Sequence, residues 1–86
     1  MTPEEAAAWM VEELARLKFL DQEHVAYKLV KIDKSLTYQN ANGNLAIVKS
    51  VLDAFRKAMP DDVVWSRSDR HWRYRKPYDK PGRMQD

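Results

Sequence analysis

V-V-W-S-R-S-D-R-H-W-R-Y-R-K, residues 63–76, is the segment around which the chain is organised. Two runs of alternating residues flank a polar turn, which predicts a two-stranded β-hairpin. A turn at Ser68–Asp69 and a four-residue loop at Arg67–Arg70 give the same register: Ser66 opposite His71, Trp65 opposite Trp72, Val64 opposite Arg73, and Val63 opposite Tyr74. Strand side chains alternate between faces. One face therefore carries Val63, Trp65, Trp72 and Tyr74, and the other carries Val64, Ser66, His71, Arg73 and Arg75.

The aromatic face of this hairpin needs a partner, because an isolated two-stranded hairpin is marginally stable in water. The preceding segment offers one, since apolar residues recur there at steps of three and four, at Leu45, Val48, Leu52, Phe55 and Met59. This spacing predicts an amphipathic helix that ends before Pro60. The cluster Asn40–Asn44 precedes it as a turn, with helix capping as the main interpretation and an anion-binding nest as the alternative.

The N-terminal half predicts two further helices. Thr2-Pro3-Glu4-Glu5 is typical of a capping box, with a helix from Pro3 to Leu17 or Lys18. Asp21 is the expected N-cap of a second helix that runs to about Asp33. Residues Leu36–Gln39 alternate, which is consistent with a short third strand or an extended loop.

The expected fold class is therefore α+β: three helices followed by a C-terminal hairpin, in the order of a winged-helix domain. The predicted core consists of Met10, Leu14, Leu17, Val25, Leu29, Leu45, Val48, Leu52, Phe55, Trp65 and Trp72. Residues 1–76 should form a single compact domain. Residues 77–86 contain two prolines and a glycine, and we expect a flexible tail there.

Composition excludes several classes of protein. The 86 residues include no cysteine, so neither a disulfide framework nor a thiolate metal site is available. Apolar runs are too short for a membrane span and the N-terminus is acidic, so we expect a cytoplasmic protein without a membrane partner. The net charge is only +2, but residues 63–76 hold five basic residues against Asp69 alone, whereas residues 1–33 hold seven acidic and four basic residues.

The sequence carries no pattern typical of an enzyme. His24 and His71 are the only histidines, and neither has a second metal ligand at helical spacing. The serines lie outside any nucleophile elbow or triad pattern. We therefore expect no catalytic residues, no metal, no small-molecule cofactor and no enzymatic activity.

Two functional hypotheses remain. The first is a nucleic-acid-binding or regulatory module that uses the basic residues Arg67, Arg70, Arg73 and Arg75, with Lys49 and Lys57 as further contacts. The second is a protein-interaction module, including a homodimer, in which an exposed aromatic residue or an edge strand makes the contact. The solvent exposure of Trp65 and Trp72 separates a packing role for these rings from a binding role.

Four segments also carry a resemblance. N-A-N-G-N-L-A-I (residues 40–47), V-L-D-A-F-R-K (residues 51–57), V-V-W-S-R and W-R-Y-R together resemble a family of small bacterial proteins of unknown function. The resemblance implies one compact domain. It implies no activity and no site residue.

Overall fold

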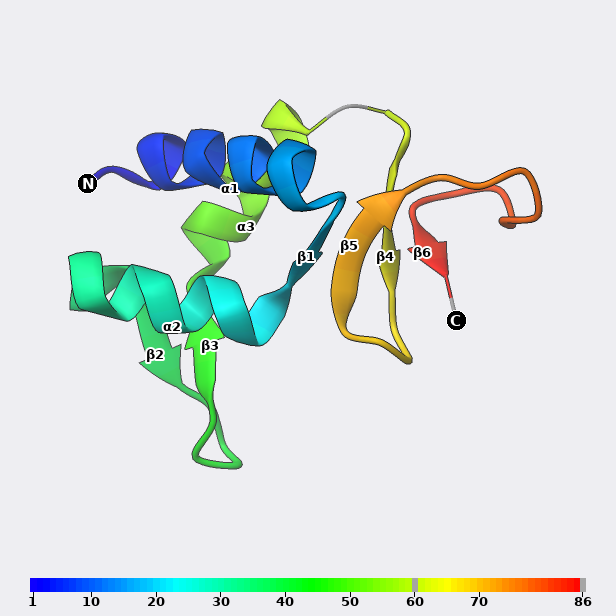
Figure 1. Cartoon of the computed structure of the whole chain (residues 1–86). Coiled ribbons are helices and arrows are strands. Elements are labelled where there is room, and N and C mark those ends of the chain that lie inside the picture. The colour runs from blue at the N-terminus through cyan, green and yellow to red at the C-terminus, as the bar shows by residue number, and fades with distance from the viewer. Residues whose placement is uncertain (60, 86) are drawn as a thin grey trace.

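The computed structural model describes residues 1–59 and 61–85, and within them three α-helices are interspersed with short strands (Figure 1). The α+β class is confirmed. None of the described helices is long and apolar enough to cross a membrane. In chain order the elements are α1 Pro3–Leu17, β1 Phe19–Asp21, α2 Gln22–Ile32, the 3-10 helix η1 Lys34–Leu36, β2 Thr37–Gln39, β3 Leu45–Ile47, α3 Lys49–Ala58, β4 Val63–Ser66, β5 His71–Tyr74 and β6 Met84–Gln85.

The predicted hairpin forms with the predicted register. β4 and β5 are antiparallel, and Trp65 pairs with Trp72 across them, with ring centroids 4.8 Å apart. Residues 67–70 make the connecting loop. It closes through a hydrogen bond of 2.8 Å from the Arg70 N–H to the Ser66 carbonyl, and Arg70 itself adopts a positive φ of 56°.

The expected order of three helices followed by a C-terminal hairpin is only partly correct, because strands also lie between the helices. β1 pairs antiparallel with β5 and β6 pairs parallel with β4, giving a four-stranded sheet in the order β1-β5-β4-β6. The strand predicted within Leu36–Gln39 exists as β2, but it pairs with β3 in a separate two-stranded sheet. β1 and β6 could not be predicted from the sequence, because strands of two or three residues are too short to show an alternation of apolar and polar residues.

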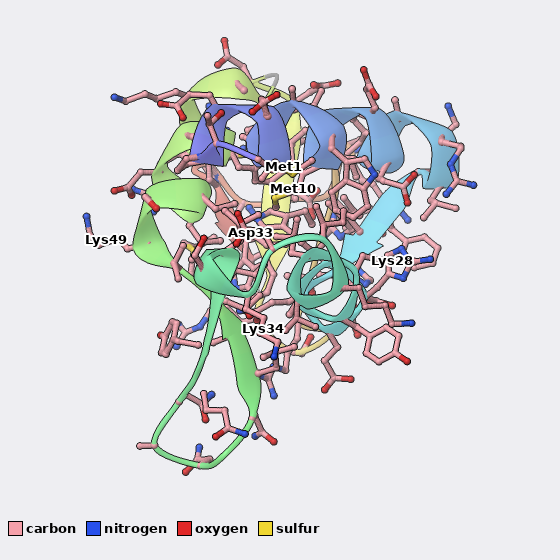
Figure 2. All side chains as sticks on the ribbon, turned by 90° about the vertical axis from the view of Figure 1, so that its left-hand side faces the viewer. Met1, Met10, Lys28, Asp33, Lys34 and Lys49 are labelled. Atoms are coloured by element: carbon pink, nitrogen blue, oxygen red, sulfur yellow. The ribbon has the colours of Figure 1, made fainter. Side chains whose placement is uncertain are left out.

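The predicted third helix begins later than expected. Leu45–Ile47 is strand β3, and α3 starts at Lys49. Consequently the asparagine cluster caps no helix and forms the loop of the β2–β3 hairpin, which extends away from the body of the molecule (Figure 2). The side-chain oxygen of Asn40 accepts the N–H groups of Asn42 and Asn44 at 3.0 and 3.1 Å. Both N–H groups therefore already have an acceptor, whereas an anion-binding nest would need them to donate to the anion.

The core lies between the helices and the inner face of the four-stranded sheet, which is the face that carries Trp65 and Trp72. Phe55 of α3 contacts Trp72 edge to face, with centroids 5.1 Å apart, so α3 supports the hairpin as predicted. Of the predicted core residues, Met10, Leu14, Val25, Leu29, Phe55 and Trp72 are buried, while Leu45, Val48, Leu52 and Trp65 are partly buried against them. Leu17 is half-buried.

Residues 76–85, here called the C-terminal strap, follow β5. Flexibility of the predicted tail stays a prediction, and both Asp86 and the Pro60 boundary of the predicted helix lie outside the described residues. The strap nevertheless returns to the sheet, where two backbone hydrogen bonds hold it. The Trp65 N–H of β4 donates to the Arg83 carbonyl at 2.6 Å, and the Arg67 N–H of the hairpin loop donates to the Gln85 carbonyl at 2.8 Å. Gln85 is only 5% exposed.

The start of α1 allows a direct test of the predicted capping box. The Glu5 N–H donates to Thr2 Oγ1 at 3.1 Å, and the Thr2 N–H donates to Glu5 Oε1 at 2.8 Å. Thr2→Ala should lower the free energy of unfolding by about 1 kcal/mol, measured by urea denaturation. Thr2→Ser keeps the hydroxyl and should retain most of the stability. Equal losses in the two variants would contradict a capping role.

Candidate functional site

A hollow of about 590 Å³ lies on the outer face of the four-stranded sheet, the face turned away from α3. The strand register explains its composition, because Phe19 pairs with Arg73 and Asp21 pairs with His71, which places these four side chains on the same face. We call this region the basic-aromatic hollow. Its lining residues are Lys18, Phe19, Ser66, Asp69, His71, Arg73, Tyr74, Arg75, Lys76 and Tyr78.

One wall of the hollow comes from the connection between α1 and β1. Lys18 ends α1 in the left-handed conformation, with φ of 72°, and its N–H donates to the Leu14 carbonyl at 2.7 Å. The chain then enters β1, where Leu20 points into the core and Phe19 points outward. Phe19 remains 46% exposed, and its ring lies 5.6 Å from that of His71. An exposed phenylalanine in a sheet leaves an aromatic surface for a ligand.

The opposite wall comes from the C-terminal strap. Tyr78 is 76% exposed, and Lys76 Nζ lies 5.9 Å from the centroid of its ring. Asp79 anchors this part of the strap: Arg73 donates two hydrogen bonds of 2.8 Å to its carboxylate, and the Lys76 N–H donates a third of 2.7 Å. The paired guanidinium of Arg73 holds the pKa of Asp79 well below its usual range, with the Lys76 N–H adding to the effect.

The charges of the hollow are mostly positive. Asp79 neutralises Arg73, but Arg75 donates to the backbone carbonyls of Lys80 and Gly82, which carry no net charge. Among the described residues, neither Lys18 nor Lys76 is within ion-pair distance of a carboxylate. The hollow thus has four cations, Lys18, Arg73, Arg75 and Lys76, and only two carboxylates, Asp69 in the lining and Asp79 behind it. This excess of positive charge attracts anions.

The structure divides the six basic residues predicted to bind nucleic acid into three groups. Arg73 and Arg75 line the hollow but also hold the strap, whereas Arg67 and Arg70 are exposed at the hairpin loop. Lys49 and Lys57 belong to α3, which packs on the other face of the sheet. Lys49 projects into solvent (Figure 2) and pairs with Asp53 at 2.9 Å. The six basic residues therefore do not lie on one surface. Their role in nucleic-acid binding stays a prediction.

Asp21 has a different environment from the one expected. It occupies the N-cap position of α2, but its carboxylate accepts no N–H from that helix and lies 3.4 Å from His71 Nδ1. The reason is that Asp21 is also the last residue of β1 and pairs with His71 of β5, so the two side chains lie next to each other on the outer face of the sheet. Asp69 approaches the same imidazole at 3.7 Å. Within residues 1–59 and 61–85 no three histidine or acidic side chains are grouped as a metal site.

Sequence reasoning missed Lys18, Phe19 and Tyr78 as members of the hollow. The triplet Phe19-Leu20-Asp21 shows no alternation of apolar and polar residues, and Leu20 also fits a hydrophobic staple, in which the residue before an N-cap packs on the helix that follows. Tyr78 lies in the segment expected to be a tail. Only the pairing of β1 with β5, together with the return of the strap, brings these residues to the hairpin.

A family model described as a family of unknown function (DUF6953) matches residues 2–74, a range that contains α1 to β5 and ends before β6. The resemblance to a family of unknown function expected from the sequence motifs is therefore confirmed. No curated protein and no solved structure matches the chain.

Proposed function

Since the chain belongs to the family of unknown function DUF6953, whose description names no activity, we propose a function from the geometry alone: a binding module for single-stranded nucleic acid, without catalytic activity. The observation that carries this proposal is the basic-aromatic hollow. It combines two exposed rings, Phe19 and Tyr78, with cations on both of its walls.

Both features suit an unpaired strand. Exposed aromatic rings stack on nucleobases, and each stacked base contributes about 1–3 kcal/mol with little dependence on sequence. Lys18, Arg75 and Lys76 would neutralise backbone phosphates and release their counterions. The hollow falls within the range of about 300–1,000 Å³ typical of small-ligand sites, so it has room for a base.

A winged-helix-like mode on duplex DNA has less support. That mode requires α3 to enter the major groove, with Lys49 and Lys57 near the DNA. Residues 33–48 separate α2 from α3, where a helix-turn-helix has a turn of three or four residues. Lys49 is also paired with Asp53, which lowers its value as a phosphate contact.

The proposal predicts salt-dependent binding of labelled single-stranded oligonucleotides, measured by fluorescence anisotropy. With three phosphates neutralised, the slope of log K against log salt should be about −2. Lys18→Asn combined with Lys76→Gln should reduce the slope to about −0.7, because two of the three contacts are removed. Asn is chosen at position 18 because it tolerates a positive φ. Tyr78→Ala should weaken binding by about 1–3 kcal/mol.

The matched control removes the same number of charges from the other side of the sheet. Lys49→Gln combined with Lys57→Gln should leave both affinity and salt slope unchanged. Absence of binding at low salt would refute the proposal. So would an equal loss in the control variant, or tighter binding to a duplex of the same length.

The alternative expected from the sequence, a protein-interaction or self-associating module, draws support from another surface. Met84, in the edge strand β6, is 59% exposed and pairs with Trp65. This apolar surface belongs to the inner face of the sheet. It is therefore separate from the basic-aromatic hollow.

A further inference from the structure

An apolar row crosses the inner face of the four-stranded sheet and extends beyond the helices that cover it. The strand registers place Leu20 beside Trp72, Trp72 beside Trp65, and Trp65 beside Met84. Exposure rises along the row: Leu20 is fully buried, Trp72 is 8% exposed, Trp65 is half-buried, and Met84 is 59% exposed. The core is thus closed at β1 and open at β6.

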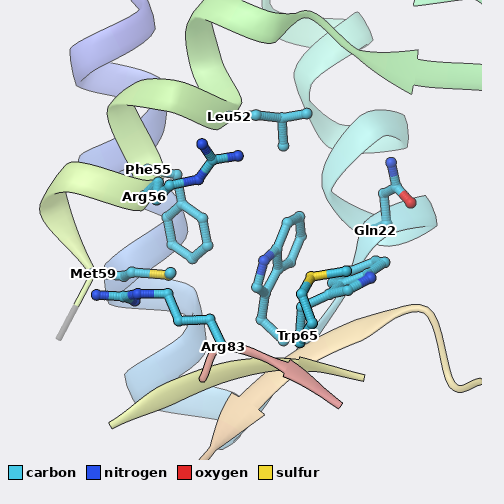
Figure 3. Close-up of a pocket in the computed structure, with 9 residues that line it drawn as sticks. Gln22, Leu52, Phe55, Arg56, Met59, Trp65 and Arg83 are labelled. Atoms are coloured by element: carbon cyan, nitrogen blue, oxygen red, sulfur yellow. The ribbon is translucent and has the colours of Figure 1, made fainter. Parts of the chain in front are cut away.

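A groove occupies the open end of this row (Figure 3). Leu52 and Phe55 approach it from α3, Met59 approaches it from the residue that follows this helix, and Trp65 and Met84 approach it from the sheet. Its volume is about 250 Å³. This is smaller than the range of about 300–1,000 Å³ that accommodates drug-sized ligands, so the groove suits one large apolar side chain.

The polar lining of the groove consists of two arginines and Gln22, with no acidic residue. Arg56 comes from the exposed side of α3, where its Nη1 lies 3.9 Å from a carboxylate oxygen of Asp53, so only part of its charge faces the groove. Arg83 comes from the strap next to Met59 (Figure 3). Arg83 Nη2 lies 3.3 Å from the exposed carboxylate of Asp61, but Arg83 Nη1 is buried and has no hydrogen-bond partner among the described residues. A buried guanidinium N–H without an acceptor is costly, and a carboxylate is its best complement.

We propose that this groove binds an acidic peptide segment of a partner protein, which inserts one apolar anchor side chain between Trp65 and α3. A carboxylate next to the anchor pairs with Arg83, and a second acidic residue faces Arg56. The apolar floor supplies affinity and the arginines select negative charge. This site is independent of the basic-aromatic hollow, because it lies on the opposite face of the sheet and shares no lining residue with it.

A selection from a random short-peptide phage library on the immobilised full chain tests the proposal. Enriched peptides should place aspartate or glutamate next to leucine, phenylalanine, tryptophan or methionine. In a synthetic copy, serine in place of the anchor should weaken binding by between about tenfold and a hundredfold, the factor expected for burial of one large apolar side chain. Binding should also shift the NMR signal of the Trp65 indole N–H.

Met84 and Arg83 lie outside the buried core, so variants at these two positions leave the core intact. Met84→Glu should abolish binding of the acidic peptides through charge repulsion, and Arg83→Gln should weaken it at least tenfold. Arg67→Gln removes one charge from the hairpin loop and should have no effect, which makes it the matched control. Circular dichroism verifies that each variant is folded.

Three results would overturn the proposal. The first is a selection that enriches nothing over the Met84→Glu chain. The second is enrichment of peptides without acidic residues, or equal affinity for Arg83→Gln. The third is a concentration-dependent dimer in sedimentation that Met84→Glu abolishes, since this would assign the groove to a second copy of the chain.

Discussion

Phe55→Ala is expected to leave the chain largely unfolded at physiological temperature. Phe55 is 1% exposed and packs edge to face on Trp72, so alanine would open a cavity at the contact between α3 and the sheet. Truncating a buried phenylalanine costs about 3–5 kcal/mol. Small domains have about 5–15 kcal/mol of total stability, and a chain of 86 residues belongs at the lower end of that range.

Urea denaturation followed by tryptophan fluorescence and far-UV circular dichroism measures this effect. Tyr27→Ala is the matched control, because it also removes an aromatic ring but from a side chain that is 58% exposed. The control should change the free energy of unfolding by no more than about 0.5 kcal/mol. Similar midpoints for the two variants would show that the contact between α3 and Trp72 does not organise the core.

Asp79→Asn is expected to release the C-terminal strap while the rest of the domain stays folded. The Asp79 side chain is 3% exposed and accepts both guanidinium hydrogen bonds from Arg73. Without the carboxylate, the Trp65 and Arg67 N–H groups that bond to the strap should exchange with solvent about tenfold faster, the factor expected for loss of one charge-assisted hydrogen bond.

Hydrogen exchange followed by NMR provides this measurement, and Asp53→Asn provides the control. Asp53 also pairs with a cation, Lys49, but that pair is exposed on α3 and should contribute little. If exchange at Trp65 and Arg67 is unchanged in Asp79→Asn, the strap is held by its backbone pairing with β4 alone.

The same variant changes the response to acid. The ordinary pKa of an aspartate is 3.8, and Arg73 lowers that of Asp79 in the folded chain. Below pH 3.8 the unfolded chain therefore binds a proton that the folded chain does not, so the stabilisation by Asp79 is complete above this pH and is lost as the pH falls through the lower, folded-state pKa. Urea denaturation should show the largest difference between native chain and Asp79→Asn near neutral pH. A difference that grows in acid would contradict this assignment.

The hairpin shows how far sequence alone can lead. Its register follows from alternation over residues 63–76, and Trp65 and Trp72 face the core for the same reason. The start of α3 was harder to predict from the sequence, because Leu45 and Val48 continue the helical spacing of Leu52 and Phe55. Pairing of Leu45–Ile47 with β2 outweighed that local pattern, and the Asn40 side chain stabilised the loop between the two strands.

Local sequence patterns were enough to predict the three helices, the capping box at Thr2, the central hairpin and part of the buried core, since all of these depend on contacts within a helical turn or between neighbouring strands. The tertiary structure alone decided what lies on each face of the sheet. β1 and β6 reach their partners across long stretches of chain, and neither is long enough to show a period. Their pairing brings Phe19 and Tyr78 to the arginines of the outer face, and brings Met84 and Arg83 to Trp65 on the inner face. Both candidate binding sites therefore arise from long-range pairing that no local pattern encodes.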